Sequence, residues 1–473
     1  MKNGFFDEIL KNFKYYISDP EIMPGSEVND KFFISFAFKI PEPAAFHSFY
    51  NKNSEKYFYF EKPSENFLIA AFGNLLEISA DGSSRILLTD QQINDIKKNY
   101  INNWRNANID SVPLIYGGVK FTHNLNSDLW SDFSDSDWFI PEIIFYSKNN
   151  LHLIICNMFF RQPYGTLEQK FEGLLRQYFS FDTDDFIPEY RKTRIDDINT
   201  DKEKLRWYRK INIALQKISV KTFSKIVLSR EVKYKLLDDP DLPGLIQQLR
   251  GIFKDCYIFA YKKKSSIFWG ASPEKLAKIE KGWIEVDALA GSISRGKTNE
   301  EDIELSEWLL SSKKNLSEQK AVVDFISESL KDFSNEILYS ETPVIKKLPN
   351  IQHLWTPIRA KLKSDIPLFS LLKHIHPTPA ICGVPWSVAL QSIIQMEGYS
   401  RGLYTGFIGW LNFENEGDFA IAIRCALIKN KILYAYAGSG IVEGSDPESE
   451  FEETQLKLKP ILSLFEHAKK NKS

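Results

Sequence analysis

The strongest constraint on the fold is a series of apolar segments joined by short polar turns in the second half of the chain. Residues 256–262 and 266–272 flank a lysine-rich turn, and residues 276–280 and 283–291 flank a Lys-Gly pair. Such paired runs predict β-hairpins. Residues 225–234 alternate in polarity and predict a further strand. This part of the chain is therefore expected to form antiparallel sheet.

Helical segments separate these strands. Residues 300–332 predict one long helix, and residues 195–222 are helix-prone, with apolar side chains at helical spacing. Those side chains are Leu205, Tyr208, Ile211 and Leu215. Ser445-Asp446-Pro447 predicts the start of the last helix, because a capping residue precedes a proline at the first helical position.

Three more strands are expected in meander order, at residues 404–411, 418–428 and 432–442. Long antiparallel runs with long helices between them indicate an α+β fold and argue against a doubly wound parallel sheet. The 473 residues include no linker rich in Gly, Ser and Pro, so one large domain is expected. Residues 1–60 carry weak signals and are assigned to a divergent N-terminal segment of that domain, ahead of residues 61–473.

Composition excludes several classes of protein. Hydrophobic residues make up 43% and charged residues 26%, as in globular proteins. A net charge of -2 gives no general attraction to nucleic acid or to an anionic membrane. No window approaches the roughly 18 apolar residues of a membrane span, and acidic residues follow the N-terminus too early for a secretory signal. Neither nucleic acid nor membrane is expected as a partner.

The four cysteines predict the compartment. Cys156, Cys256, Cys382 and Cys425 are far apart and form no CxxC pair. We expect reduced, buried thiols in a cytoplasmic protein.

Acidic residues in the last predicted helix are the first candidate site. Glu450, Glu453 and Lys457 are spaced by three and four residues and share one helical face. Acids in the first turns of a helix also complement its dipole, and Lys457 would pair with Glu453 without any ligand. Two carboxylates on one face equally suit a hard cation such as Mg²⁺.

The predicted helix over 300–332 places polar groups on its apolar stripe. Val322 and Ile326 define the stripe, Asn315 and Gln319 fall on it, and Glu318 lies at its edge. A buried carboxylate there needs a cation or strong donors, whereas a surface glutamate needs nothing.

Arg424 lies in a predicted strand whose alternate residues are small. Ala420, Ala422 and Ala426 would share its face and leave room for a bound anion, although an arginine on a solvated face is the alternative. The next strand ends in Ala437-Gly438-Ser439-Gly440. Glycines there allow close approach to backbone N–H groups, which suits a carboxylate ligand, although an ordinary turn is the alternative.

Taken in order, these segments resemble the chorismate-utilising enzymes. The resemblance is strong over residues 205–465 and weaker upstream, at Tyr116-Gly-Gly118 and Phe139-Ile-Pro141. The blocks that carry it are KIVLSR (225–230), GASPEKL (270–276), ALAGS (288–292), LLSSKKNLSE (309–318), HL (353–354), HPTPAICG (376–383), RGLYTG (401–406), AIRCA (422–426) and AGSGIV (437–442), leading to Glu450 and Glu453. It implies one α+β domain with antiparallel sheets packed face to face, helices outside, and a monomer.

The resemblance also assigns roles to residues. Lys225 is similar to the general base that takes a proton from water attacking C2 of chorismate, and Glu274 to the general acid that protonates the departing C4 hydroxyl. Mg²⁺ would be held by Glu318, Glu450 and Glu453. The set that binds the enolpyruvyl carboxylate corresponds to Tyr404, Arg424, Gly438 and Lys457. The positions that line the pocket correspond to Gly291, Ser292, His353 and Ala380.

This division of roles suits the substrate. Chorismate carries two carboxylates, so its site needs two separate positive ends. Lys225 would act as a base near neutral pH only with a pKa below its usual value of about 10.4, and Glu274 as an acid only with a pKa above about 4.3. Ser317 and Gln319 stand where histidines often flank the metal-binding glutamate of the family.

Three positions separate the branches of the family. Anthranilate synthases carry glutamine at the position of Lys225, and aminodeoxychorismate synthases commonly carry lysine at that of Ala290. Members that use amines or form salicylate tend to carry threonine at the position of Ala380. The chain thus resembles the isochorismate synthase branch, with salicylate synthase and an inactive chorismate-binding relative as alternatives. The product would feed menaquinone or siderophore synthesis.

Overall fold

The computed structural model describes residues 2–23, 32–41, 54–107, 109, 111–123, 127–160, 165–178, 191–200, 202–349, 351–364 and 366–468. Two sheets dominate these residues, and nearly all of their neighbouring strands are antiparallel. The larger sheet runs in the order β24 (Glu466–His467), β10 (Arg194–Asp197), β11 (Lys225–Leu236), β23 (Ile432–Ile441), β22 (Cys425–Lys429), β13 (Ser266–Ser272), β12 (Tyr257–Lys263), β2 (Lys56–Lys62), β3 (Phe67–Phe72), β8 (Ile143–Lys148), β9 (Leu151–Phe160), β1 (Phe32–Lys39) and β5 (Tyr100–Asn102), and β19 (Gly383–Val384) pairs with β11.

The second sheet packs against the first. Its order is β16 (Ser334–Leu338), β18 (Ile351–Leu362), β15 (Trp283–Ser294), β14 (Lys275–Glu280), β21 (Gly417–Ile421), β20 (Phe407–Leu411), β6 (Ile115–Val119), β7 (Ser136–Ile140) and β4 (Leu76–Ala80), and β17 (Val344–Lys347) pairs with β18. The helices are α1 (Lys2–Ser18), α2 (Arg85–Lys97), α3 (Trp104–Ala107), α4 (Gly165–Tyr178), α5 (Glu203–Ser219), α6 (Leu242–Ile252), α7 (Asn299–Ser311), α8 (Lys313–Lys331), α9 (Leu368–Ile375), α10 (Trp386–Glu397) and α11 (Pro447–Leu462).

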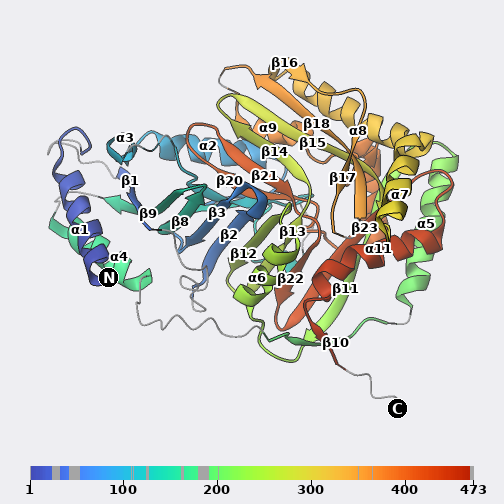
Figure 1. Cartoon of the computed structure of the whole chain (residues 1–473), viewed down its shortest axis with the longest axis horizontal. Helices are drawn as coiled ribbons and strands as arrows, with labels where there is room; N and C mark the ends of the chain where they lie inside the picture. The colour runs from blue at the N-terminus through green and yellow to red at the C-terminus, as the bar shows by residue number, and fades with distance from the viewer. Residues whose placement is uncertain are drawn as a thin grey trace.

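The alternation of β2 shows how the layers form. Phe58 and Phe60 pack into one core cluster together with side chains of the second sheet. Tyr57 and Tyr59 point the other way, into a cluster that includes side chains of α1, α4, α6 and α11. The larger sheet is therefore buried on both faces, with the second sheet on one side and helices on the other. Figure 1 shows α8 and α9 beside β15 and β18, on the second sheet.

The α+β class and the face-to-face sheets are confirmed. The hairpins β12–β13 and β14–β15 and the strand β11 are confirmed as well. The last helix begins as expected, because Asp446 caps it by accepting a hydrogen bond from the backbone of Ser449.

Several predicted elements are wrong in detail. Residues 300–332 form two helices, because Ser312 adopts an extended conformation and its hydroxyl caps α8. In α5 the predicted stripe is misplaced at its first residue, since Leu205 is 58% exposed and Trp207 is buried instead. The strand expected from residue 404 begins at Phe407.

The largest error concerns residues 418–428, which form two strands in different sheets. β21 belongs to the second sheet and β22 to the larger one. Between them Arg424 has a φ of 50°, a left-handed conformation that L-residues with a side chain rarely adopt. Arg424 therefore lies where the chain crosses from one sheet to the other, and not within a strand among the alanines.

The N-terminal residues that gave weak signals include two strands of the larger sheet. β1 pairs with β9 and β5, and β2 lies between β3 and β12. Among the described residues, no helix combines the length and the apolar character needed to cross a bilayer.

Candidate active site

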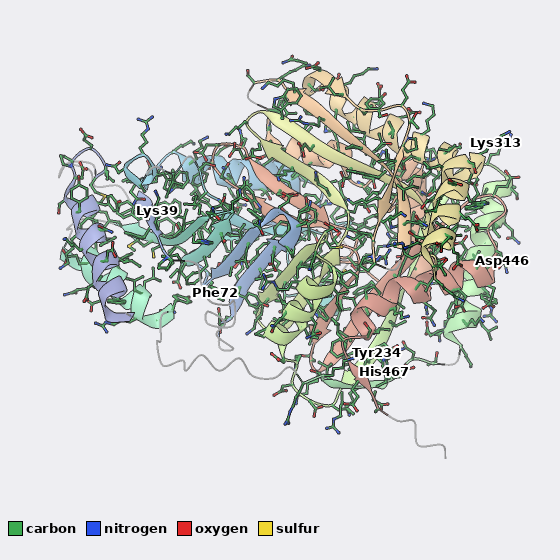
Figure 2. The ribbon with its side chains drawn as sticks, viewed as in Figure 1. Lys39, Phe72, Tyr234, Lys313, Asp446 and His467 are labelled. Atoms are coloured by element: carbon green, nitrogen blue, oxygen red, sulfur yellow. The ribbon has the colours of Figure 1, made fainter. Side chains whose placement is uncertain are left out.

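A cavity of about 600 Å³ lies where the two sheets meet α8 and α11. All thirteen residues predicted from the sequence line it, although they come from segments more than 200 residues apart. They are Lys225, Glu274, Gly291, Ser292, Glu318, His353, Ala380, Tyr404, Arg424, Gly438, Glu450, Glu453 and Lys457. Figure 2 shows Lys313 and Asp446, at the N-terminal ends of α8 and α11, on the same side of the molecule.

Lys225 begins β11 and points into the cavity. Its side chain is 7% exposed, and its Nζ lies 2.5 Å from Oε1 of Glu318 on α8. Gly440, on the neighbouring strand β23, leaves room for this lysine. A Cβ at position 440 would lie 3.1 Å from Cε of Lys225, closer than most real contacts of this kind. The Glu318 carboxylate therefore holds Nζ of Lys225 in place, and the lack of a side chain at Gly440 leaves the space that Lys225 occupies.

Glu274 precedes β14 and is anchored through its backbone. Its N–H donates to Oγ of Ser272 at 3.2 Å, and its carbonyl accepts a bond from the N–H of Ile421 at 3.0 Å. Burial, reinforced by the charge of Asp287, raises the pKa of Glu274 to about 7, against the opposing effect of nearby lysines. The Glu274 carboxyl can therefore carry a proton at neutral pH and give it up.

The cavity holds an arginine without a partner. Arg424 is 8% exposed, and its guanidinium makes no hydrogen bond or ion pair with any residue that the structure describes. Burial lowers its pKa, although it stays a cation. A buried cation without a partner is costly, so an anionic ligand would complete this site.

Groups beside Arg424 extend the same end of the cavity. Nζ of Lys457 donates to the carbonyl of Gly438 at 3.0 Å and to Oε1 of Glu453 at 2.5 Å. A Cβ at position 438 would lie 3.0 Å from the hydroxyl oxygen of Tyr404, so glycine brings the backbone close to this phenol.

Three carboxylates of the cavity are the candidate cation ligands. Glu318 pairs with Lys225, Glu453 with Lys457, and Glu450 accepts a hydrogen bond from Ser439. The donors suit a hard divalent cation, since all are carboxylate oxygens on one cavity. In the described part of the chain, however, no three acidic, His or Cys side chains stand close enough together to hold an ion. The residues fit Mg²⁺ in kind, and holding it together would require these three side chains to come closer to one another.

Burial and charge set the protonation of these acids. Burial and the neighbouring Glu453 raise the pKa of Glu450. Burial acts in the same direction on Glu453, but Lys457 and Arg424 outweigh it and lower the pKa of that carboxyl. Of these two acids, it is Glu453 whose ionised form is favoured, and Lys457 already lies beside it.

His353 and Ser292 form a neutral part of the wall. Nδ1 of His353 lies 2.8 Å from Oγ of Ser292, on the adjacent strand. Burial, Arg424 and Lys457 lower the pKa of His353 to about 3, so its imidazole is uncharged.

Gly291 has a φ of 64°, and a Cβ there would lie 3.0 Å from Oδ1 of Asn315. Gln319, predicted on the buried stripe of α8, donates to the carbonyl of Ala288 at 2.9 Å.

The sequence assigned no role to a buried ion pair behind the cavity wall. The Arg401 guanidinium bonds both carboxylate oxygens of Glu397, at 2.8 and 2.6 Å. It also donates to the carbonyls of Val227, at 2.7 Å, and Ile381, at 3.0 Å, and both of these residues line the cavity. Only the family block around 401–406 pointed to this region.

The chain was compared with known proteins. Residues 21–466 match a family model described as chorismate binding enzyme. The Bacillus subtilis protein named isochorismate synthase MenF is 31% identical, over 93% of this chain and 95% of its own. A Pseudomonas aeruginosa protein named salicylate biosynthesis isochorismate synthase is 32% identical, over 85% of this chain and 83% of its own. The solved structure of the menaquinone-specific isochorismate synthase MenF of Escherichia coli has the same fold, with a TM-score of 0.79 at 21% identity over 97% of this chain and 99% of its own.

Proposed function

Since the chain belongs to the family of chorismate-binding enzymes, we propose that it is an isochorismate synthase, an isomerase that converts chorismate to isochorismate. The observation that carries the proposal is that one cavity is lined by Lys225, Glu274 and Arg424, whose guanidinium has no partner among the described residues. A base, an acid and an anion site meet there. The isochorismate would feed menaquinone or siderophore synthesis.

The reaction exchanges one hydroxyl for another through the ring. Lys225, the proposed general base, accepts a proton from a water molecule whose oxygen forms a bond to C2. Both ring double bonds shift, from C1=C2 and C5=C6 to C1=C6 and C4=C5, and the bond between C4 and its oxygen breaks. Glu274 donates its proton to that oxygen, which leaves as water, so one water enters and one departs. A Glu274 pKa of about 7 supports this role, because an ordinary glutamate would be ionised at neutral pH.

Two ends of the cavity would hold the two carboxylates of the substrate. Arg424 and Lys457, with the Tyr404 hydroxyl and the backbone at Gly438, provide donors for the enolpyruvyl carboxylate. The other carboxylate would bind to Mg²⁺ held by Glu318, Glu450 and Glu453. The ion would neutralise that carboxylate and orient the ring.

The remaining wall is proposed to disfavour competing reactions. Gly291, Ser292 and neutral His353 line the pocket without adding charge. Ala380 presents no hydroxyl to the cavity, and Ala290 presents no amine. Their small side chains argue for release of isochorismate and against elimination of pyruvate or attack by an enzyme nucleophile.

The protein is further proposed to act as a cytoplasmic monomer. Its cavity is complete within one chain, and its four cysteines are buried and unpaired, as in a reducing compartment. Residues 1–60 are proposed to belong to the same domain as 61–473, because β2 lies inside the larger sheet.

Product analysis tests the function. The protein is incubated with chorismate and Mg²⁺, and the products are separated by chromatography. Isochorismate is the expected product. Salicylate with pyruvate would instead identify a salicylate synthase, and unchanged chorismate would identify an inactive binding relative.

A further inference from the structure

A lysine on β17 connects Glu274 to a buried acid outside the cavity. Nζ of Lys346 donates to the carbonyl of Pro273, the residue before Glu274, at 3.1 Å, and to Oδ2 of Asp287 at 3.0 Å. Neither Lys346 nor Asp287 lines the cavity, so neither is placed to touch the substrate. Lys346 thus joins the segment that carries the proposed acid to strand β15.

Asp287 places a fixed negative charge beside Glu274. It is 5% exposed, yet Lys346 and Lys275 outweigh burial and lower its pKa, so the carboxylate stays ionised. The other charged groups that act on Glu274 are cations from every surrounding element, namely Lys225 of β11, Lys346 of β17, Lys457 of α11 and Arg424 between β21 and β22. Without Asp287, all of them would favour the ionised form of Glu274.

We propose that Lys346 and Asp287 are positioning residues for Glu274. Lys346 holds the backbone of the 273–274 segment in place, and the negative charge of Asp287 opposes a second negative charge on Glu274. The inference rests on the proposed function, since it explains how an acid stays protonated among cations. Sequence spacing does not reveal the pair, because its members are 59 residues apart and meet only through the sheet.

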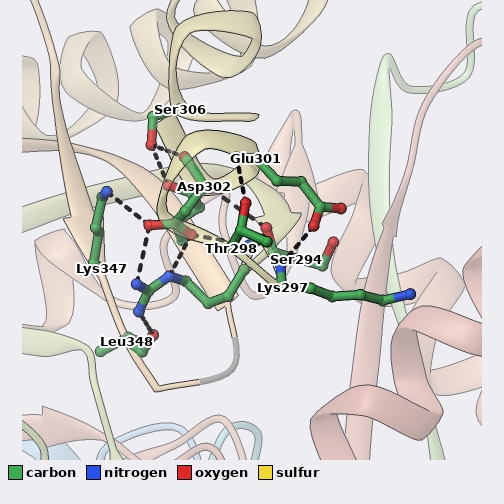
Figure 3. A network of polar contacts seen from close by, with 11 residues as sticks. Ser294, Lys297, Thr298, Glu301, Asp302, Ser306, Lys347 and Leu348 are labelled. Atoms are coloured by element: carbon green, nitrogen blue, oxygen red, sulfur yellow. Dashed lines mark hydrogen bonds and ion pairs between the residues drawn. The ribbon is translucent and has the colours of Figure 1, made fainter. Parts of the chain in front are cut away.

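The same strand supplies a matched control. Lys347, adjacent to Lys346, pairs instead with Asp302 at 2.8 Å. Figure 3 shows Asp302 at the centre of a separate network near the start of α7, and Arg295 binds the same carboxylate at 2.7 Å. Asp302→Asn therefore weakens an ion pair to β17 without changing a charge that acts on Glu274.

The experiment titrates Glu274 directly by infrared difference spectroscopy. The band of its protonated carboxyl is assigned as the one that Glu274→Gln removes. In the wild type its midpoint is expected near pH 7. Asp287→Asn, which keeps an oxygen for Lys346, should lower the midpoint by about one pH unit. Lys346→Gln should raise it, because a cation beside Glu274 is lost while Lys275 keeps Asp287 ionised.

Activity provides the second measurement. With chorismate, Asp287→Asn should reduce kcat severalfold near neutral pH and leave KM within twofold, whereas Asp302→Asn should leave the titration midpoint in place. Equal midpoints in wild type, Asp287→Asn and Lys346→Gln would overturn the inference. If the wild type leaves chorismate unchanged while the midpoints shift as stated, the proposed function fails and the positioning of Glu274 stands.

Discussion

Two buried arginines of this chain differ in how they are paired. Arg401 is 2% exposed, and its guanidinium bonds Glu397, two backbone carbonyls and the Thr405 hydroxyl. Arg424, also buried, has no such partner among the described residues. A buried cation is stable when its donors are satisfied and costly when they are not. The first arginine stabilises the fold, and the second is available to an anionic substrate.

The same contrast separates the cavity from the structure behind it. The cavity residues Lys225 and Lys457 form ion pairs with carboxylates that a cation would also bind. The pair Glu397–Arg401 fixes the walls at Val227 and Ile381. Substitutions inside the cavity should therefore change turnover or binding, and substitutions behind it should change stability.

Removal of the proposed base should have the largest effect on turnover. Lys225→Ala is expected to lower kcat about 10²–10⁴-fold, since the proposed general base is lost. Binding of chorismate, measured by isothermal titration calorimetry, should change much less. A kcat within tenfold of the wild type would remove Lys225 from the mechanism.

Replacing Arg401, the buried arginine that is fully paired, should mainly lower stability. Arg401→Met is expected to lower the free energy of unfolding by about 3–5 kcal/mol, because it leaves Glu397 ionised and buried without its partner. Arg424→Met should lower it by less than about 1 kcal/mol, since no ion pair is broken. Urea denaturation followed by circular dichroism measures both, and equal losses in the two variants would break the comparison.

Replacing Arg424 should instead weaken the binding of chorismate. Arg424→Met is expected to raise the KM for chorismate about 100-fold, since a charged hydrogen bond to a substrate carboxylate is lost. Arg424→Lys, the matched control, keeps the charge and should bind better than the methionine variant. A KM unchanged in Arg424→Met would place the substrate elsewhere.

The pH dependence of kcat/KM should reveal the ionisation of Glu274. The plot of kcat/KM against pH is expected to have a limb with its midpoint near pH 7, because the protonated fraction of Glu274 falls as pH rises through its pKa. Beyond that midpoint the protonated fraction falls about tenfold per pH unit. Rates that do not vary between pH 5 and 10 would exclude Glu274 as the acid.

The smallest expected effect concerns the glycine beside the base. Gly440→Ala would place a Cβ 3.1 Å from Cε of Lys225, so the amine must shift by a few tenths of an ångström. We expect kcat to fall about three- to tenfold with little change in stability. Ser439→Ala, one residue away, removes a hydrogen bond to Glu450 and serves to separate steric from metal-site effects.

Much of the site was accessible from the sequence, because its blocks resemble a known family and each block carries a residue of the cavity. The crossover at Arg424 was not, since residues 418–428 are apolar apart from Asp418 and Arg424 and contain no Gly, Pro or Asn that would indicate a change of sheet. The split at Ser312 was also missed, because its cap sits within a helical pattern. The pair Lys346–Asp287 depends on strand order, which spacing along the chain does not determine.

Oxygen labelling tests the central claim most directly. The reaction is run in H₂¹⁸O with chorismate and Mg²⁺, and the product formed at early times is analysed by mass spectrometry. Activation of solvent by Lys225 predicts isochorismate with one ¹⁸O at C2, formed by the wild type and not by Lys225→Ala. Isochorismate without the label would show that the hydroxyl migrates from C4 and would contradict the account.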